Sequence, residues 1–203
     1  MVTVNLGFLV SGRGSNMQAI IDACRDGRLD ANPAVVISNN ASSGALERAR
    51  RAGVTAYHLS LITHPDPDKL DLMMIKTLQK YGINLVILAG YTQKIRPKVL
   101  NTFKNRIINI HPSLLPKFGG QGMYGMKVHE AVLATGQKET GVTVHLVNDE
   151  YDEGLILVQR RLPVDQDDTL ESLAARVLET EHNLYVETIQ KIIKGEINLP
   201  GAC

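Results

Sequence analysis

Short apolar segments alternate with amphipathic segments along the first half of the chain. The short segments are rich in β-branched residues and apolar at nearly every position, which is typical of strands buried on both faces. Such strands are expected at Val4–Val10, Ala34–Ser38, Thr55–Leu59, Asn84–Ala89 and Arg106–Ile110. Between them, apolar residues recur at helical spacing in Asn16–Arg25, Gly44–Ala52 and about Asp68–Tyr81. This order predicts a doubly wound, mostly parallel α/β sheet with right-handed crossovers.

The pattern changes after Ile110. A loop rich in proline and glycine leads to a helical segment near Val128–Thr135, and two strands then follow close together at Gly141–Val147 and Leu155–Leu162. Because the connection between these two strands is short, we expect them to be antiparallel and to lie at the edge of the sheet.

The end of the chain predicts one long amphipathic helix. This helix starts near Asp168 and Glu171, which have the spacing of a capping box, and its apolar pattern continues to Gly195. A cap is also expected before the second helix, where Ser42 and Ser43 precede the apolar pattern.

The composition narrows the class of protein. With 203 residues, 44% of them hydrophobic, the chain has enough apolar material for one buried domain, and no run reaches the roughly 18 apolar residues of a membrane span. Its 22 Lys and Arg nearly balance 21 Asp and Glu, which excludes a strong basic field for nucleic acid. Cys24 and Cys203 have neither disulfide nor metal-ligand spacing. We therefore expect a soluble, cytoplasmic protein that binds neither membranes nor nucleic acid.

A small glycine-rich loop, Ser11–Asn16 with the sequence SGRGSN, joins the first strand to the first helix. Small residues there let backbone amides approach an anion at the positive end of the helix. A dinucleotide motif needs a third glycine near Met17 and a P-loop needs a lysine after its last glycine, so the loop favours a single phosphate. A tight turn capped by Ser15 or Asn16 explains the loop as well, and this motif alone leaves the choice open.

Polar residues follow the fifth strand. Asn109 and His111 are two residues apart and point to the same side, and Pro112 ends the strand. Ligands of doubly wound folds bind beyond the carboxyl ends of the strands, the edge onto which the phosphate loop also opens. A structural role is the better explanation of each residue alone, but the pair at a strand end favours a site.

A carboxylate is the natural third member, because it orients an imidazole and raises its pKa. Asp152, at the start of a second-half strand, is the best candidate, whereas Asp149, Glu150 and Glu153 are more typical of solvated turn charges. His145 lies in an apolar strand and is expected to be hydrogen-bonded within the core or behind the site rather than to be a catalyst.

Five motifs, SGRGSN, LAGYTQKI, NIHPSLLP, DEYDEG and LETEH, occur in an order that resembles the folate-dependent formyltransferases over nearly the whole chain. The resemblance implies the Rossmann-like formyltransferase fold and 10-formyltetrahydrofolate as co-substrate, without a metal. The early SGxGSN loop and the short length are similar to the branch that formylates the amine of glycinamide ribonucleotide in purine biosynthesis. The tRNA-specific branch would carry an additional carboxyl-terminal domain, and the deformylases an amino-terminal one.

The resemblance also assigns roles to residues. It implies a catalytic set and a loop for the substrate phosphate, an acid near the ribose, and a segment that cradles the pterin. These are Asn109, His111 and Asp152 for catalysis, with Asn109 also near the folate; Gly14, Ser15 and Asn16 for the phosphate; Glu181 for the ribose; and Thr92, Gln93, Lys94 and Ile95 for the folate, with Lys69 as a further basic residue. Gln93 and Lys94 stand where family members often have an arginine. The loop Gly119–Lys127 is longer than in many members, and it either shapes the ribonucleotide pocket or is a mobile surface loop.

By this resemblance the chain is one domain, residues 1–203, with a phosphate-binding half (1–110) and a catalytic and folate-contacting half (111–203). Asn109 and a protonated His111 stabilise the oxyanion, and Asp152 keeps His111 cationic. A monomer or a homodimer is expected. A deformylase or formyl-sugar transferase with the same residues is the nearest alternative, and a catalytically silent nucleotide-binding protein is another.

Overall fold

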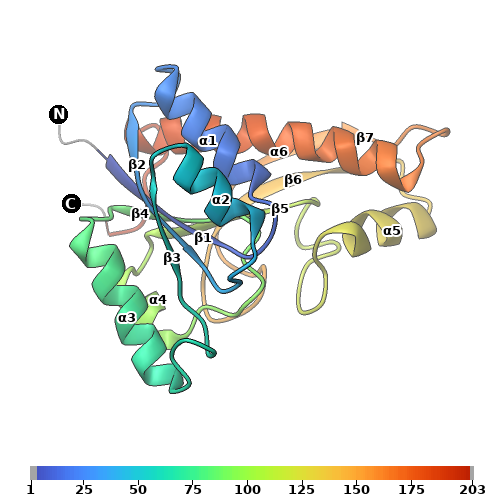
Figure 1. Ribbon diagram of the computed structural model, residues 1–203. Helices are drawn as coiled ribbons and strands as arrows, with labels where there is room; N and C mark the ends of the chain where they lie inside the picture. The colour runs from blue at the N-terminus through green and yellow to red at the C-terminus, as the bar shows by residue number, and fades with distance from the viewer. Residues whose placement is uncertain (1–3, 202–203) are drawn as a thin grey trace.

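The computed structural model describes residues 4–201 and has the predicted doubly wound sheet (Figure 1). Within this range seven strands pair in the order β3-β2-β1-β4-β5-β6-β7. Their bounds are β1 Val4–Val10, β2 Ala31–Ser38, β3 Thr55–His58, β4 Leu85–Leu88, β5 Ile107–His111, β6 Glu139–Leu146 and β7 Ile156–Pro163. The pairs among β1 to β5 are parallel, and β6 and β7 are antiparallel to each other, as predicted. β6 is also antiparallel to β5. Cys203 lies outside the described residues.

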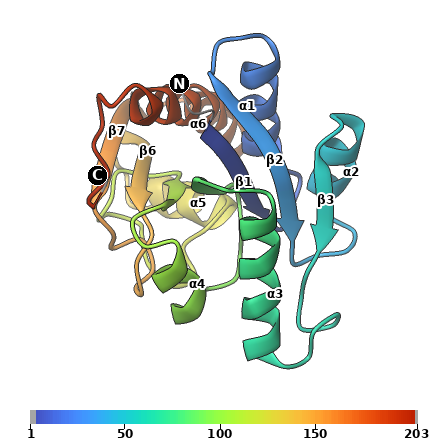
Figure 2. The same ribbon diagram turned by 90° about the vertical axis from the view of Figure 1, so that its left-hand side faces the viewer.

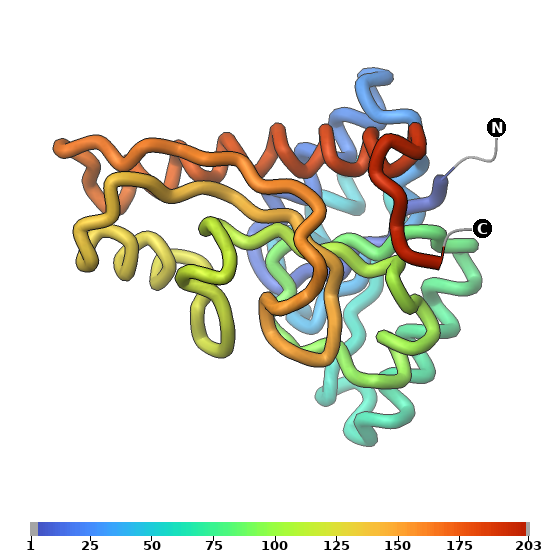
Figure 3. The backbone as a smooth tube through the Cα atoms, turned by 180° about the vertical axis from the view of Figure 1, so that it is seen from behind, coloured from blue at the N-terminus to red at the C-terminus, as the bar shows by residue number. Residues whose placement is uncertain are grey.

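Helices cover both faces of the sheet. Their bounds are α1 Ser15–Arg25, α2 Gly44–Arg51, α3 Pro67–Lys80, α4 Pro97–Thr102, α5 Met126–Ala134 and α6 Leu170–Ile193. The core beneath α1, α2 and α6 lies on one face, and the core beneath α3 and α4 lies on the other (Figure 2). The long helix α6 runs beside β6 and β7 in the view from behind (Figure 3). None of the helices in residues 4–201 is long and apolar enough to cross a membrane.

Strand β1 shows why the apolar runs form central strands. Leu6, Phe8 and Val10 pack into the core beneath α1 and α6, whereas Leu9 packs into the core beneath α3. This alternation follows from the two-residue period of a strand and leaves no face for polar residues. Gly7 lets α3 pack closely against the sheet, because a Cβ at this position would lie 2.8 Å from Leu78 Cδ2.

The starts of two helices differ from the predictions. The N-cap of α1 is Gly14, with a left-handed φ of 76° and no side-chain cap, so the proposal that Ser15 or Asn16 caps the helix is wrong. The capping box of α6 is formed by Thr169 and Ser172.

Asp168 lies at the start of this helix but is not part of its capping box, contrary to the prediction. It accepts hydrogen bonds from the Asp165 backbone at 2.9 Å and from the Ser172 hydroxyl at 2.7 Å, so Asp168 and Glu171 are not the capping box. The prediction was wrong because several polar residues near a helix start share similar spacing. Ser43 does cap α2, as expected, by accepting from the Leu46 backbone.

The switch point of the sheet lies between β1 and β4. The chain passes from β1 through α1 to β2, and it returns from β3 through α3 to β4 on the other face. β1 and β4 are nevertheless paired, from Leu6 with Leu85 to Leu9 with Leu88. The loops after their carboxyl ends therefore diverge, and open α/β sheets bind ligands in the crevice between such loops.

Candidate active site

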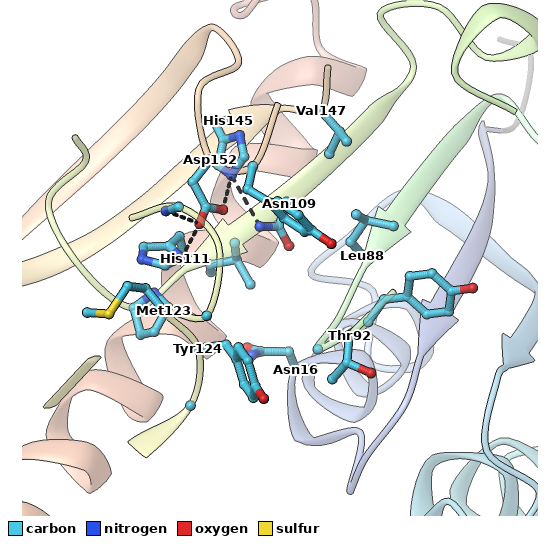
Figure 4. Close-up of a pocket in the computed structure, with 18 of the residues that line it drawn as sticks. Asn16, Leu88, Thr92, Asn109, His111, Met123, Tyr124, His145, Val147 and Asp152 are labelled. Carbon is cyan, nitrogen blue, oxygen red and sulfur yellow. Dashed lines mark hydrogen bonds and ion pairs between the residues drawn. The ribbon is translucent and has the colours of Figure 1, made fainter. Parts of the chain in front are cut away.

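A cavity of about 660 Å³ opens at the switch point. Its lining comes from the loops after β1 and β4, the end of β5, the turn between β6 and β7, the glycine-rich loop before α5, and α6. Side chains from these elements face one another across the cavity (Figure 4). A cavity of this size is typical of sites for small-molecule ligands.

Asn109 and His111 line the cavity from β5, two residues apart as predicted. The antiparallel register places His145 of β6 opposite Asn109. Asn109 Nδ2 lies 3.1 Å from His145 Nε2, and His145 Nδ1 lies 2.8 Å from the Leu146 carbonyl oxygen. Because a carbonyl only accepts, His145 carries a proton on Nδ1, and its Nε2 faces both the Asn109 amide and Asp152. His145 therefore fixes the orientation of the Asn109 amide.

Asp152 joins this pair from the turn between β6 and β7, and not from the start of a strand as expected. Its Oδ2 lies 3.4 Å from His111 Nδ1, and its Oδ1 lies 3.5 Å from His145 Nε2 (Figure 4). The backbone N–H of Gly120 donates to Oδ2 at 3.0 Å. The structure thus brings the three predicted catalytic residues together and adds His145.

The environment of Asp152 favours its ionised form. Burial raises the pKa of this carboxyl, but the contact with His145, the charge of His111 and the Gly120 amide outweigh burial, so that the pKa lies below its usual range. The carboxylate is therefore charged at neutral pH and faces both imidazoles.

The pKa of His111 shifts in the direction opposite to the expected one. Burial lowers this pKa, the charge of Asp152 and the Phe118 carbonyl raise it without reversing the shift, and His145 lowers it further. The expectation that Asp152 keeps His111 cationic is wrong for this structure, because burial outweighs the carboxylate. His111 Nε2 donates to the Phe118 carbonyl oxygen at 2.7 Å, so the ring nitrogen nearest the loop is already engaged.

The opposite end of the cavity combines a free helix start with a buried acid. Asn16 lines the cavity from the first turn of α1, where no acidic residue or side-chain cap occupies the backbone amides. Asn16 Nδ2 donates to Glu181 of α6 at 3.1 Å, and Asn16 Oδ1 is buried without a partner. Burial raises the pKa of Glu181 to about 7, against the hydrogen bond from Asn16. Gly14 and Ser15 shape the helix start but lie behind the lining of the cavity, which Arg13 joins.

The predicted folate segment, Thr92–Ile95, forms a further wall of the cavity. Lys94 Nζ lies 3.8 Å from Glu150 Oε2 and 5.5 Å from the centre of the Tyr151 ring, so the loop after β4 contacts the turn between β6 and β7. The apolar side chains of Leu88, Ile95 and Val147 line the same region.

Lys69 is a further predicted site residue that does not line this cavity. It lies on the first turn of α3, its side chain is 77% exposed, and its Nζ is 4.0 Å from Asp66 Oδ2. It lines neither this cavity nor the smaller neighbouring one. Lys69 is therefore a solvated residue at a helix start.

Sequence reasoning left the role of the glycine-rich loop open, and it missed Arg13 and His129. The loop residues Gly120–Met126 line the cavity, and Tyr124 is among the side chains drawn around it in Figure 4. His129 of α5 is buried, and its Nδ1 has no partner. Burial and the charge of His111 both lower the pKa of His129. The position of Arg13 inside SGRGSN was a usable signal, but His129 lies in an ordinary helical pattern.

The converging groups suit acyl-type group transfer. An amide donor, an imidazole and a carboxylate lie within contact of one another, which is the set required to stabilise an oxyanion and to move a proton. In residues 4–201 no group of three or more His, Cys, Asp or Glu is placed to hold a metal ion.

A doubly wound sheet that carries an amide, an imidazole and a carboxylate at one end of a cavity and a free helix start at the other is typical of α/β group-transfer proteins. The chain belongs to the formyl transferase family, whose model, described as "Formyl transferase", matches residues 4–189. It is 42% identical to phosphoribosylglycinamide formyltransferase, chloroplastic, of Arabidopsis thaliana, over 95% of this chain and 66% of that protein. It is 35% identical to phosphoribosylglycinamide formyltransferase of Escherichia coli (strain K12), over 97% and 90%.

The solved structures agree with this family. Glycinamide ribonucleotide transformylase 1 from Symbiobacterium toebii superposes with a TM-score of 0.90 at 44% identity, over 98% of this chain and 92% of that one. The chain spans just under two thirds of the plant relatives' length, 66% and 62%, but most of the bacterial protein.

Proposed function

We propose that the protein transfers the formyl group of 10-formyltetrahydrofolate to the amine of glycinamide ribonucleotide, giving formylglycinamide ribonucleotide and tetrahydrofolate in purine biosynthesis. The observation that carries the proposal is the convergence of Asn109, His111 and Asp152 at one end of a cavity whose other end holds a free helix start and buried Glu181. The names of the bacterial and plant relatives support the same substrates.

The ribonucleotide lies along α1 and α6. Its phosphate is held by the amides that follow Gly14, including those of Ser15 and Asn16, with Arg13 nearby, because the first turn of α1 has free N–H groups and no competing acid. A ribose diol offers two hydroxyl donors. Asn16 Oδ1 is a buried acceptor with no hydrogen-bond partner, and the buried Glu181 accepts one hydrogen bond, from Asn16 Nδ2, and can accept more. The site therefore fits a ribose monophosphate.

The folate lies between the loop after β4 and the turn between β6 and β7. Leu88, Ile95 and Val147 provide an apolar surface for a flat pterin, and the backbone groups of Thr92–Ile95 provide hydrogen bonds to its edge. Gln93 and Lys94 contribute mainly backbone here, so the missing arginine does not remove the site. We leave Lys69 out of the proposed folate site because of its exposure and distance from the cavity.

The reaction joins the amine nitrogen to the formyl carbon and then breaks the bond from that carbon to N10 of the folate. Negative charge develops on the formyl oxygen during attack. Asn109 Nδ2 carries two hydrogens, one of which is committed to His145 Nε2. The other is free to donate to the oxyanion, and its direction is fixed by the first.

His111 moves the proton. The attacking nitrogen must lose a proton, and N10 must gain one as it leaves. With Nδ1 facing Asp152, Nε2 is the nitrogen that turns to the substrates, and it accepts the proton and returns it to N10, directly or through water. This step requires that Nε2 leave the Phe118 carbonyl, to which it donates in this structure, and that the ring proton of the neutral imidazole move to Nδ1, where it is donated to Asp152. Because burial lowers the pKa of His111, its imidazole is neutral before the reaction and can accept a proton.

The test is an assay of 10-formyltetrahydrofolate loss with purified protein, with and without glycinamide ribonucleotide, and with product analysis by mass spectrometry. Stoichiometric formylglycinamide ribonucleotide and tetrahydrofolate, formed only when the amine is present, are expected. Formate released at the same rate without the amine would show a deformylase instead. We further propose a cytoplasmic monomer or homodimer in which residues 1–110 bind the phosphate and supply Asn109 and the folate segment Thr92–Ile95, and residues 111–203 supply His111, Asp152 and further folate contacts.

A further inference from the structure

Ser11 stands at the end of β1, beside the switch point, and its hydroxyl joins three strand ends. Ser11 Oγ donates to Asn39 Oδ1, just after β2, at 2.6 Å. It accepts from the backbone N–H of Thr92, after β4, at 2.9 Å and from the Thr92 hydroxyl at 3.1 Å. We call these three residues the Ser11 bridge. The side chain is buried, and the Ser11 backbone N–H also donates to the Gly90 carbonyl at 3.0 Å.

The bridge lies at the switch point of the sheet. The loops after β1 and β4 leave a switch point in different directions, which is why a ligand crevice forms there. In this protein the Ser11 hydroxyl, together with the backbone hydrogen bond from Ser11 to Gly90, holds the two loops together at the base of the crevice. Its one donor and its acceptor sites are all used, so the bridge fixes the separation of the loops in one geometry.

Each of the two loops carries one half of the proposed site. The loop after Ser11 contains Arg13 and leads into Asn16 on the ribonucleotide side, whereas Thr92 begins the segment on the folate side. We propose that Ser11 is a positioning residue that sets the distance between the two bound substrates, and so between the amine nitrogen and the formyl carbon. This inference rests on the proposed function.

The physical consequence differs from that of a binding residue. Substrates held in a near-attack arrangement react far faster than loosely held ones, and a misplacement of about 1 Å costs on the order of a hundredfold in rate. Loss of the bridge leaves both half-sites and the backbone bond from Ser11 to Gly90 intact, but it removes the side-chain contacts that fix the separation of the two loops. Each substrate should therefore still bind alone, while the rate of transfer in the ternary complex falls.

Ser11→Ala tests this directly. We expect kcat to fall on the order of 30- to 100-fold, with the Kd of glycinamide ribonucleotide alone and of a non-reactive folate analogue alone changed by less than about twofold. Thr92→Val removes the hydroxyl donor and keeps the backbone donor, so it should lower kcat by a smaller factor, about three- to tenfold. Thr92→Ser restores the donor and should restore kcat.

Thr188→Val is the matched control, because Thr188 is also buried but its hydroxyl bonds only to the Leu184 carbonyl within α6, at 2.7 Å. It should lower the Tm without changing kcat. A fully active Ser11→Ala, or a Ser11→Ala that loses binding of one substrate and keeps kcat, overturns the inference. If Ser11→Ala does not fold, the Thr92 pair decides, and equal kcat for Thr92→Val and Thr92→Ser overturns it. Wild-type protein that transfers no formyl group contradicts the proposed function, whereas active wild type with equally active variants contradicts only the bridge.

Discussion

The two ends of the cavity are built in different ways. The ribonucleotide end uses the start of α1 and the side of α6, with Asn16 and Glu181 in direct contact. The catalytic end uses a strand, β5, and a turn, and Asp152 reaches it with a left-handed φ of 59°. The first end therefore depends on one buried acid and on backbone amides, whereas the second depends on charge placed beside two imidazoles. Substitutions should separate these roles, because the first end should control affinity and the second should control rate.

The sharpest test of the catalytic end is Asp152→Asn, which keeps the shape of the side chain and removes its charge. Because the carboxylate raises the pKa of His111 against burial, its loss should lower that pKa further and remove the partner of Nδ1. We expect kcat to fall by about a hundredfold or more, with little change in the Kd of either substrate. Single-turnover formyl transfer and NMR titration of His111 measure the two effects.

Glu153→Gln is the control for Asp152→Asn, because Glu153 is an exposed charge in the same turn. It should transfer formyl groups at the wild-type rate. An Asp152→Asn variant with unchanged rate and an unchanged His111 titration would leave Asp152 as an ordinary turn residue and would remove the difference between the two ends.

The ribonucleotide end is tested by Glu181→Gln. Replacing the acid should weaken glycinamide ribonucleotide binding by about tenfold, the scale of one hydrogen bond to a charged group, and leave folate binding unchanged. The same change should stabilise the fold above neutral pH. A buried Glu whose pKa is raised from 4.5 to about 7 loses stability as pH rises between those values, so the gain should grow from pH 4.5 to pH 7 to about 3 kcal/mol at most.

Urea denaturation at several pH values checks the stability of Glu181→Gln, and calorimetry checks its affinity. Glu187→Gln is the control, since Glu187 lies on the same helix but is half exposed and pairs with Arg160 at 2.6 Å. Its unfolding free energy should follow the pH dependence of the wild type. If the unfolding free energy of Glu181→Gln has the same pH dependence as that of the wild type, burial does not raise the pKa of Glu181.

The same contrast explains what the sequence could predict. The loop SGRGSN and the pair Asn109 and His111 are local, and their distance from a strand end follows from the chain itself, so both were found without any relative. The charge state of His111 was predicted wrongly, because it depends on how deeply the folded chain buries the imidazole, and burial lowers its pKa more than Asp152 and the Phe118 carbonyl raise it.

Other parts of the fold cannot be predicted from local sequence patterns. Helix α4 has only six residues, too few to show helical periodicity, and its one cue is Pro97 at the start. The turn that carries Asp152 needs Gly154, because a Cβ there would lie 1.7 Å from the Leu146 carbonyl oxygen. Such a close approach depends on the register of β6 with β7, which shifts between Val144 and His145, and no spacing in the sequence indicates it.

A smaller effect is expected for Lys94, which belongs to the folate loop and contacts the turn of the catalytic end. Lys94→Met removes its ion pair with Glu150 and its contact with the Tyr151 ring but keeps the backbone that faces the folate. Because the pair is exposed, the two loops should lose only a little mutual order. We expect the KM for 10-formyltetrahydrofolate to rise about two- to threefold with kcat unchanged, as measured by steady-state kinetics. A tenfold loss of kcat would place Lys94 in the chemistry.

The smallest effect is expected for Lys69, the residue that sequence resemblance assigned to the folate and that the structure places elsewhere. Its Nζ lies 4.0 Å from Asp66, both side chains are largely solvated, and ion pairs of this kind contribute less than about 0.5 kcal/mol. Lys69→Ala should therefore leave the KM for 10-formyltetrahydrofolate and kcat within about 1.5-fold of the wild type. Steady-state kinetics at low ionic strength, where a long-range attraction between Lys69 and the folate carboxylates would be greatest, is the most demanding measurement. A KM that rises severalfold at low salt and returns to the wild-type value at high salt would show that Lys69 attracts the folate from outside the cavity, and the folate end would then extend onto α3.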